Sequence, residues 1–234
     1  MSLSQLRMTR GALAIAAVYL GVSLVYLVCD FETRAKLAEY IVASPSQVFE
    51  HGRVWTLITA PFFELDFINL LLNIFMLWAF IPTMERFWGT PRFYRFFAIT
   101  ALAGTVGGVL VGWALGHDTL IYGLSPFVLA TIVAFGITHA RMPVQFFGVL
   151  PLTARQVMFG FLVVEALMVV FGQHWELGAS MAAGCLAAYI MTSRTWSPGL
   201  AWKKWRLARM RRRLSVIEGG VKPPRKRDGE RWLN

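Results

Sequence analysis

The sequence contains only two cysteines and few charged residues. Cys29 and Cys185 both lie in apolar runs and share no spacing pattern, so neither a disulfide nor a metal site is expected. Charged residues make up 15% of the 234 residues, whereas 56% are hydrophobic and the mean hydropathy is +0.54. This composition excludes an ordinary soluble domain and indicates a membrane protein. No cofactor is expected.

Six apolar stretches predict an all-α bundle of six transmembrane helices, at residues 11–29, 67–83, 96–115, 125–139, 154–171 and 177–191. No small-residue cleavage site follows the first stretch, which is therefore expected to be an anchor. A connection of more than thirty residues joins the first two stretches. We expect helical segments in it at 34–42 and 45–49, and an interfacial position because it contains Trp55 and Pro61-Phe62-Phe63.

The fourth stretch is unusually short for a membrane-crossing helix. At a rise of ~1.5 Å per residue, 125–139 covers about 22 Å, less than the ~30 Å hydrocarbon core. Pro126 suits the first turn of a helix, which would then begin at Ser125 in the middle of the membrane. Irregular backbone before Ser125 is tolerated at that depth only if protein buries it or it lines a wet cavity.

Small residues recur at four-residue spacing in two of the predicted helices. The third stretch has Gly104, Gly108 and Gly112, and the sixth has Ala179, Ala183 and Ala187. This spacing lets transmembrane helices approach one another closely. We therefore interpret these residues as packing positions.

An even number of crossings places both ends of the chain, and alternate loops, on the same side of the membrane. Basic residues are concentrated in these ends and loops. Thirteen of them lie after residue 193, against three acidic residues. This asymmetry predicts a cytoplasmic tail at 1–10, a membrane domain at 11–193 and a cytoplasmic tail at 194–234. Within the second tail, 202–217 is a predicted basic amphipathic helix that binds anionic lipid. Nucleic acid is not the expected partner. The compact six-span organisation suggests a bacterial inner (plasma) membrane.

Several motifs follow one another in a characteristic order along the predicted bundle. They are Trp55 with the run ITAPFF, the second stretch ELDFINLLLNIFMLWAF, the turn MERFWG, the segment Tyr122-Gly123-Leu124-Ser125 and the link VQFFGVLPLTAR. In this order and spacing they resemble the rhomboid family of intramembrane serine proteases. The resemblance covers residues 52–191. It implies a rhomboid-like bundle with a long first loop and a short fourth helix that starts mid-membrane.

The resemblance places Ser125 at the position of the nucleophile but supplies no general base. A rhomboid serine is activated by a histidine on the sixth helix, a position taken here by Met181 or Ser180, depending on the alignment. Neither side chain accepts a proton near neutral pH. The four histidines of the chain lie outside the sixth stretch: His51, His117, His139 and His174.

Other positions of the family's site are also altered. The oxyanion-site positions, His-x4-His-x3-Asn in active members, are occupied by Glu64, Asn69 and Asn73, of which the asparagines retain N–H donors. Thr56 stands where the first loop has an arginine, and Pro126 replaces the glycine after the serine, removing a backbone N–H. With the base also missing, these changes indicate a site released from catalysis.

The same residues also allow purely structural interpretations. Ser125 has the position of an N-cap, which would bond the N–H groups two and three residues further on. Asn69 and Asn73, one turn apart, would bond neighbouring helices. Glu165 is costly inside the fifth stretch and is expected to face the protein interior.

Two functional hypotheses follow. The first is a rhomboid-like membrane protein, a pseudoprotease, that binds or directs transmembrane segments of client proteins, as inactive members of such families do. The alternative is an intramembrane serine protease, a serine-type endopeptidase in which Glu64 or His174 assists Ser125. A transporter is less well supported because no inverted repeat is evident.

Overall fold

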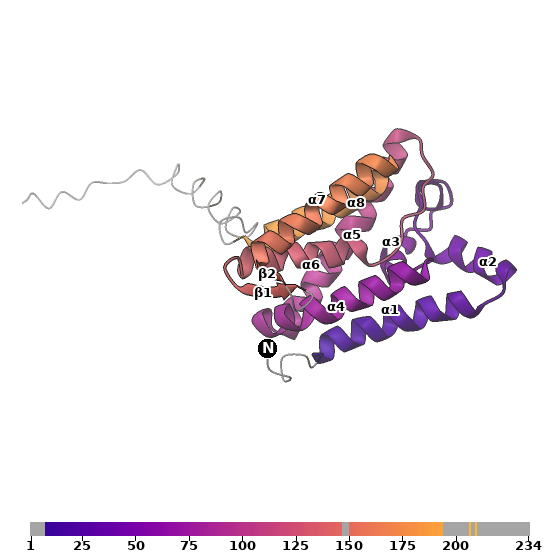
Figure 1. The fold of residues 1–234 in the computed structure, drawn as a ribbon. Coiled ribbons are helices and arrows are strands. Elements are labelled where there is room, and N and C mark those ends of the chain that lie inside the picture. The colour runs from indigo at the N-terminus through magenta and orange to yellow at the C-terminus, as the bar shows by residue number, and fades with distance from the viewer. Residues whose placement is uncertain (1–7, 147–149, 194–205, 207–208, 210–234) are drawn as a thin grey trace, which may run out of the picture. The chain divides into compact units, whose positions relative to one another are not determined.

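The computed structural model describes residues 8–146, 150–193, 206 and 209, and within it the chain divides into two compact units, Met1–Thr195 and Trp196–Asn234. The first unit is a helical bundle (Figure 1). Its six longest helices occur where the sequence predicts them: α1 (Arg10–Val28), α4 (Phe67–Trp88), α5 (Thr90–Leu115), α6 (Ser125–Thr138), α7 (Ala154–Gly172) and α8 (Trp175–Thr192). The predicted all-α membrane bundle is confirmed.

Four of these helices are long and apolar enough to cross a membrane: α1, α4, α5 and α7. The helix α6 is shorter, as predicted, and α8 is not among the four. A count of six crossings therefore stays a prediction. Of the predicted amphipathic helix at 202–217, all but Arg206 and Arg209 lies outside the described residues; these two are helical and exposed.

The short helix α6 lies at the centre of the bundle. Every residue from Pro126 to Gly136 is buried, because α6 packs against α4, α5, α7 and α8. A helix that is apolar on all sides suits such a position. Its first residue, Ser125, is thereby held inside the protein.

The predicted small-residue packing is confirmed between α5 and α8, which contact each other more extensively than any other pair of described elements. A Cβ added at Gly107 would lie 2.5 Å from the Cβ of Ala183, and one added at Gly108 would lie 3.1 Å from the Cβ of Ser180. A Cβ at Gly104 would lie 2.6 Å from the Cβ of Pro126. The backbones of α5, α8 and the start of α6 therefore meet closely because these positions lack side chains.

The helices α4 and α5 are longer than the apolar stretches that predicted them. α4 continues past residue 83 to Trp88, and α5 begins at Thr90, before residue 96. The charged residues between the stretches end the hydrophobic pattern but not the helices, which are interrupted only at Gly89 with φ +80°. One of these charges, Glu85, is 3% exposed and caps α1. Its oxygens accept hydrogen bonds from the N–H groups of Gly11 (3.1 Å) and Ala12 (2.9 Å).

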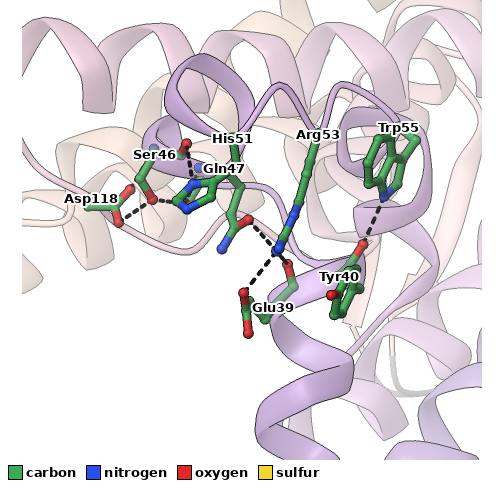
Figure 2. Close-up of polar contacts among 9 residues, drawn as sticks. Glu39, Tyr40, Ser46, Gln47, His51, Arg53, Trp55 and Asp118 are labelled. Carbon is green, nitrogen blue, oxygen red and sulfur yellow. Dashed lines mark hydrogen bonds and ion pairs between the residues drawn. The ribbon is translucent and has the colours of Figure 1, made fainter.

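The long first connection contains α2 (Phe31–Ile41), a π turn (Ser46–Glu50), α3 (Thr56–Thr59) and a 3-10 turn (Ala60–Phe62), which confirms the helical segments predicted near 34–42 and 45–49. Figure 2 shows the polar contacts that hold it. The backbone N–H and Oγ of Ser46 donate to Asp118, at 2.9 and 2.6 Å. Burial raises the pKa of Asp118, but these hydrogen bonds more than offset that effect and hold the pKa below its ordinary value.

Further contacts hold the same connection to itself and to the approach to α6. The guanidinium of Arg53 donates to Glu39 (3.1 Å) and Gln47 (2.7 Å), and the indole N–H of Trp55 donates to the carbonyl of Tyr40 (Figure 2). Ala43 and Ile121 exchange two backbone hydrogen bonds in an isolated bridge. The connection is thus an ordered support for the segment that leads to Ser125.

One element between α6 and α7 was not predicted from the sequence. Residues predicted only as a link form an antiparallel hairpin of β1 (Pro143–Phe146) and β2 (Leu150–Thr153). Thr153 then begins α7 through a capping box with Gln156.

Candidate functional site

Ser125 does not cap its helix. The cap position of α6 belongs to Leu124, no side-chain cap bond is made, and Ser125 is the first helical residue. The N-cap interpretation is therefore wrong. The Ser125 hydroxyl instead contacts the amide of Asn73 on α4, with Nδ2 at 3.3 Å and Oδ1 at 3.5 Å from Oγ.

Asn73 is the centre of a buried polar cluster formed with Tyr19 of α1, Glu64 and Ser125. Its Nδ2 lies 3.0 Å from the Tyr19 hydroxyl and 3.3 Å from Glu64 Oε2. The Tyr19 hydroxyl in turn donates to Glu64 Oε2 at 2.8 Å. An amide nitrogen carries two hydrogens and faces three oxygens here, so Ser125 shares this donor with Tyr19 and Glu64.

Glu64 is an almost fully buried carboxyl group, 2% exposed, just before α4. Burial raises its pKa, and the hydrogen bond from Tyr19 only partly offsets this effect. No described residue forms an ion pair with it. A Cβ at Gly123, where φ is +85°, would lie 2.8 Å from Oε2. The turn before Ser125 thus approaches the carboxyl closely. Position 123 favours glycine, because its φ is positive and the carboxyl leaves no room for a Cβ.

The helix α8 brings no proton acceptor to this cluster. Ser180 is buried against α5, and its hydroxyl has no hydrogen-bond partner among the described residues. Met181 instead lines a cavity between α6, α7 and α8.

The four histidines lie elsewhere, and three of them bond to other residues. His51 contacts the carbonyl of Ser46, His117 contacts Glu176 at 2.5 Å, and His139 contacts Thr138. His174 is exposed at the cap position of α8. None of them has a hydrogen bond to Ser125 among the described residues. Among the described hydrogen bonds, the titratable groups connected to Ser125 are therefore Glu64 and Tyr19, and each is connected to it through Asn73.

Two of the other residues singled out in the sequence lie outside the cluster. Asn69 is exposed on α4, and none of the cluster's hydrogen bonds involves it. Thr56 is buried in the first connection, where its hydroxyl donates to the carbonyl of Arg53 at 2.7 Å. Pro126 lies beside the cluster, packed on Gly104 and with its carbonyl close to Gly184.

A separate cavity of about 680 Å³ lies between α6, α7 and α8. Most of its lining is apolar, including Leu129 and Val133 of α6, and Glu165 and Cys185 line it as well. The predicted inward orientation of Glu165 therefore corresponds to a cavity wall and not to a packed interior. Cavities of this size commonly hold ligands or side chains.

Residues 13–192 match the family described as "Eukaryotic integral membrane protein (DUF1751)". The chain belongs to this family. No curated protein matches it. Because the match covers nearly all of the helical bundle, it supports an integral membrane protein.

Membership of DUF1751 corrects one prediction. The family is described as eukaryotic, so the bacterial inner membrane expected from the sequence has no support. A compact bundle of apolar helices identifies a membrane fold but does not discriminate between kinds of cell.

Sequence reasoning missed Tyr19 as a member of the polar cluster of this DUF1751 protein, and Gly123 as the residue whose backbone approaches Glu64. Tyr19 occupies an apolar stretch in which a tyrosine is unremarkable, and only the packing of α1 against α4 shows its partner. Gly123, two residues before α6, had a local signal, because glycine is the residue that most readily adopts a positive φ.

Proposed function

We propose that this protein is a rhomboid-like pseudoprotease, which binds or directs transmembrane segments of client proteins without cutting them. The observation that carries the proposal is the environment of Ser125, whose described hydrogen-bond partner is the amide of Asn73. An amide does not accept a proton at neutral pH. A serine with no general base in reach is a weak nucleophile.

The buried cluster supports a structural role for the residues that would otherwise serve catalysis. Glu64 Oε2 accepts from Tyr19 and Asn73, so the described hydrogen bonds orient the carboxyl toward α1 and α4. Asn73 likewise has its N–H groups directed at neighbouring oxygens. The cluster thereby joins α1 and α4 to the start of α6.

The helix α7 supports the binding part of the proposal. Its buried residues, Ala154, Val157 and Met158, all lie at its N-terminal end, and none beyond Met158 is buried. A helix so sparsely packed leaves apolar surface beside the cavity between α6, α7 and α8. A transmembrane segment that enters there would bury surface on both partners.

One observation favours the second candidate, an intramembrane serine endopeptidase. Glu64 lies one amide away from Ser125, through Asn73. A small rearrangement of Asn73 would let a carboxylate serve as the base for the serine. Proteolysis is therefore the competing outcome of the test.

The test uses the full chain purified into lipid bilayers and a panel of single-pass substrates with a photocrosslinker in the transmembrane segment. We expect crosslinked adducts but no cleaved fragments, and the same yield of adducts from Ser125→Ala. Fragments that are formed by the wild type and lost in Ser125→Ala would replace this proposal with the protease.

We also propose that both termini are cytoplasmic and that the basic segment 202–217 binds anionic lipid. The distribution of basic residues along the sequence supports both statements.

A further inference from the structure

Glu165 is a carboxyl group without a described partner inside the membrane bundle. It makes no hydrogen bond and no ion pair with the described residues, although it lines the cavity between α6, α7 and α8. Its neighbours in the cavity are mainly aliphatic. An ionisable group in such a place is costly unless something pairs with it.

The depth of Glu165 restricts what that partner is. At ~1.5 Å per residue, it lies about 16 Å along α7 from Ala154 and about 10 Å from Gly172. Both distances place it well inside a hydrocarbon core of ~30 Å. An amine in a lipid headgroup does not reach that depth, and an acyl chain offers no donor. A side chain on another transmembrane segment does reach it.

The middle of α7, between tight contacts near its two ends, leaves room for such a segment. Near its start, α7 packs tightly on α6, where a Cβ at Gly136 would lie 2.5 Å from the Cβ of Met158. Near its end it packs on α8, where a Cβ at Gly178 would lie 2.6 Å from a methyl of Val169. Glu165 lies between these contacts, on the wall of a cavity of about 680 Å³.

We propose that this cavity binds a transmembrane segment carrying a basic side chain near its middle, and that Glu165 pairs with that side chain. The proposal rests on the proposed function and adds the chemistry by which clients are selected. Lys and Arg are also costly in lipid, and pairing with Glu165 offsets part of the penalty of both groups. A segment with only aliphatic residues would fill the cavity but leave the carboxyl unpaired.

The experiment uses the full chain in phosphatidylcholine bilayers and synthetic leucine-rich transmembrane peptides with Lys, Leu or Glu at the central position. Affinity is measured by energy transfer between labels on the peptide and the protein. A second readout is the labelling of Cys185 by a membrane-permeant maleimide, because Cys185 lines the same cavity. Cys29, at the end of α1, is the internal control.

We expect the Lys peptide to bind about tenfold more tightly than the Leu peptide and to protect Cys185 but not Cys29. Glu165→Gln should reduce the preference to within about threefold, since the amide keeps the shape but loses the charge. Glu165→Lys should reverse it in favour of the Glu peptide. Equal binding of the Lys and Leu peptides to the wild type, unchanged in Glu165→Gln, would overturn the inference.

A further variant separates failure of this inference from failure of the proposed function. Ala182→Phe fills the cavity from α8, where Ala182 lines it, without altering any charge. If all peptides bind the wild type equally and Ala182→Phe weakens them all, the cavity binds clients without charge selection, and only the present inference fails. If no peptide binds or protects Cys185, and phospholipid alone occupies the cavity, both proposals fail.

Discussion

The hydroxyl of Tyr19 on α1 donates a hydrogen bond to Oε2 of Glu64, 2.8 Å away, in a place that water hardly reaches. This contact joins the first helix to the loop before α4, and Asn73 extends it to Ser125 at the start of α6. Three of the residues that the rhomboid resemblance assigns to the catalytic site, Glu64, Asn73 and Ser125, are thus part of the packing between three helices.

Glu64 should make stability depend on pH. Because burial raises its pKa in the folded state, an unfolded chain ionises first as pH rises, and folding stability falls from about pH 4 until the folded pKa is passed. Glu64→Gln removes this dependence. In thermal unfolding in detergent from pH 4 to 8, the unfolding temperature of the variant should rise relative to that of the wild type as pH rises. Tyr19→Phe removes a hydrogen bond that lowers the pKa of Glu64, and should extend the fall to higher pH. A stability difference that is constant with pH would contradict the assignment.

The close approach of α5 and α8 predicts that Gly107→Ala destabilises the protein. The added Cβ would lie 2.5 Å from the Cβ of Ala183, and such overpacking costs about 1–3 kcal/mol. Gly160→Ala is the matched control, since no atom lies within 4 Å of a Cβ there and alanine favours the helix by up to about 1 kcal/mol. The double variant Gly107→Ala/Ala183→Gly should recover much of the loss. Destabilisation by Gly160→Ala, or none by Gly107→Ala, would contradict this packing.

Glu85 should be needed for the start of α1. It accepts from the N–H groups of Gly11 and Ala12, and the hydroxyls of Thr9 and Thr90 also donate to it. Glu85→Ala leaves these donors without an acceptor and should cost about 1–3 kcal/mol, whereas Glu85→Gln retains one acceptor and should cost less. Hydrogen exchange at the amides of Gly11 and Ala12 reports the effect locally. Protection that is unchanged in Glu85→Ala would exclude the cap.

The basic tail should bind anionic membranes through its charge. A peptide of residues 202–217 is expected to bind vesicles containing phosphatidylserine, each basic residue contributing about 1 kcal/mol. Reversing Arg211, Arg212 and Arg213 to glutamate should weaken binding at least a hundredfold. Neutral vesicles and high salt are the controls. Unchanged binding of the triple variant would contradict the prediction that the tail binds membranes through its charge.

The arrangement of the helices could be predicted because apolar length and small-residue spacing are local properties. The length of the segment 125–139 already predicted that α6 is shorter than the other membrane helices, and Gly104 and Gly108 already indicated a close helix contact. The hairpin before α7 could not be predicted, since its strands are short and its pairing depends on the ends of two helices.

The site was less predictable than the fold. Ser125 and Asn73 were identified from the resemblance, and the structure brings them together. The capping role predicted for Ser125 failed because its hydroxyl bonds across the bundle to α4, a contact no local rule contains. Asn69 and Asn73 are one turn apart, yet only Asn73 is buried, because the neighbours of α4 differ along its length.

The central claim is that Ser125 is not activated as a nucleophile. The most direct measurement is the rate at which a fluorophosphonate labels the full chain in bilayers, compared with Ser125→Ala and with an active intramembrane serine protease. The account predicts that the wild type and Ser125→Ala react equally slowly between pH 6 and 9. Labelling that is fast in the wild type, mapped to Ser125 and lost in Ser125→Ala, would contradict it.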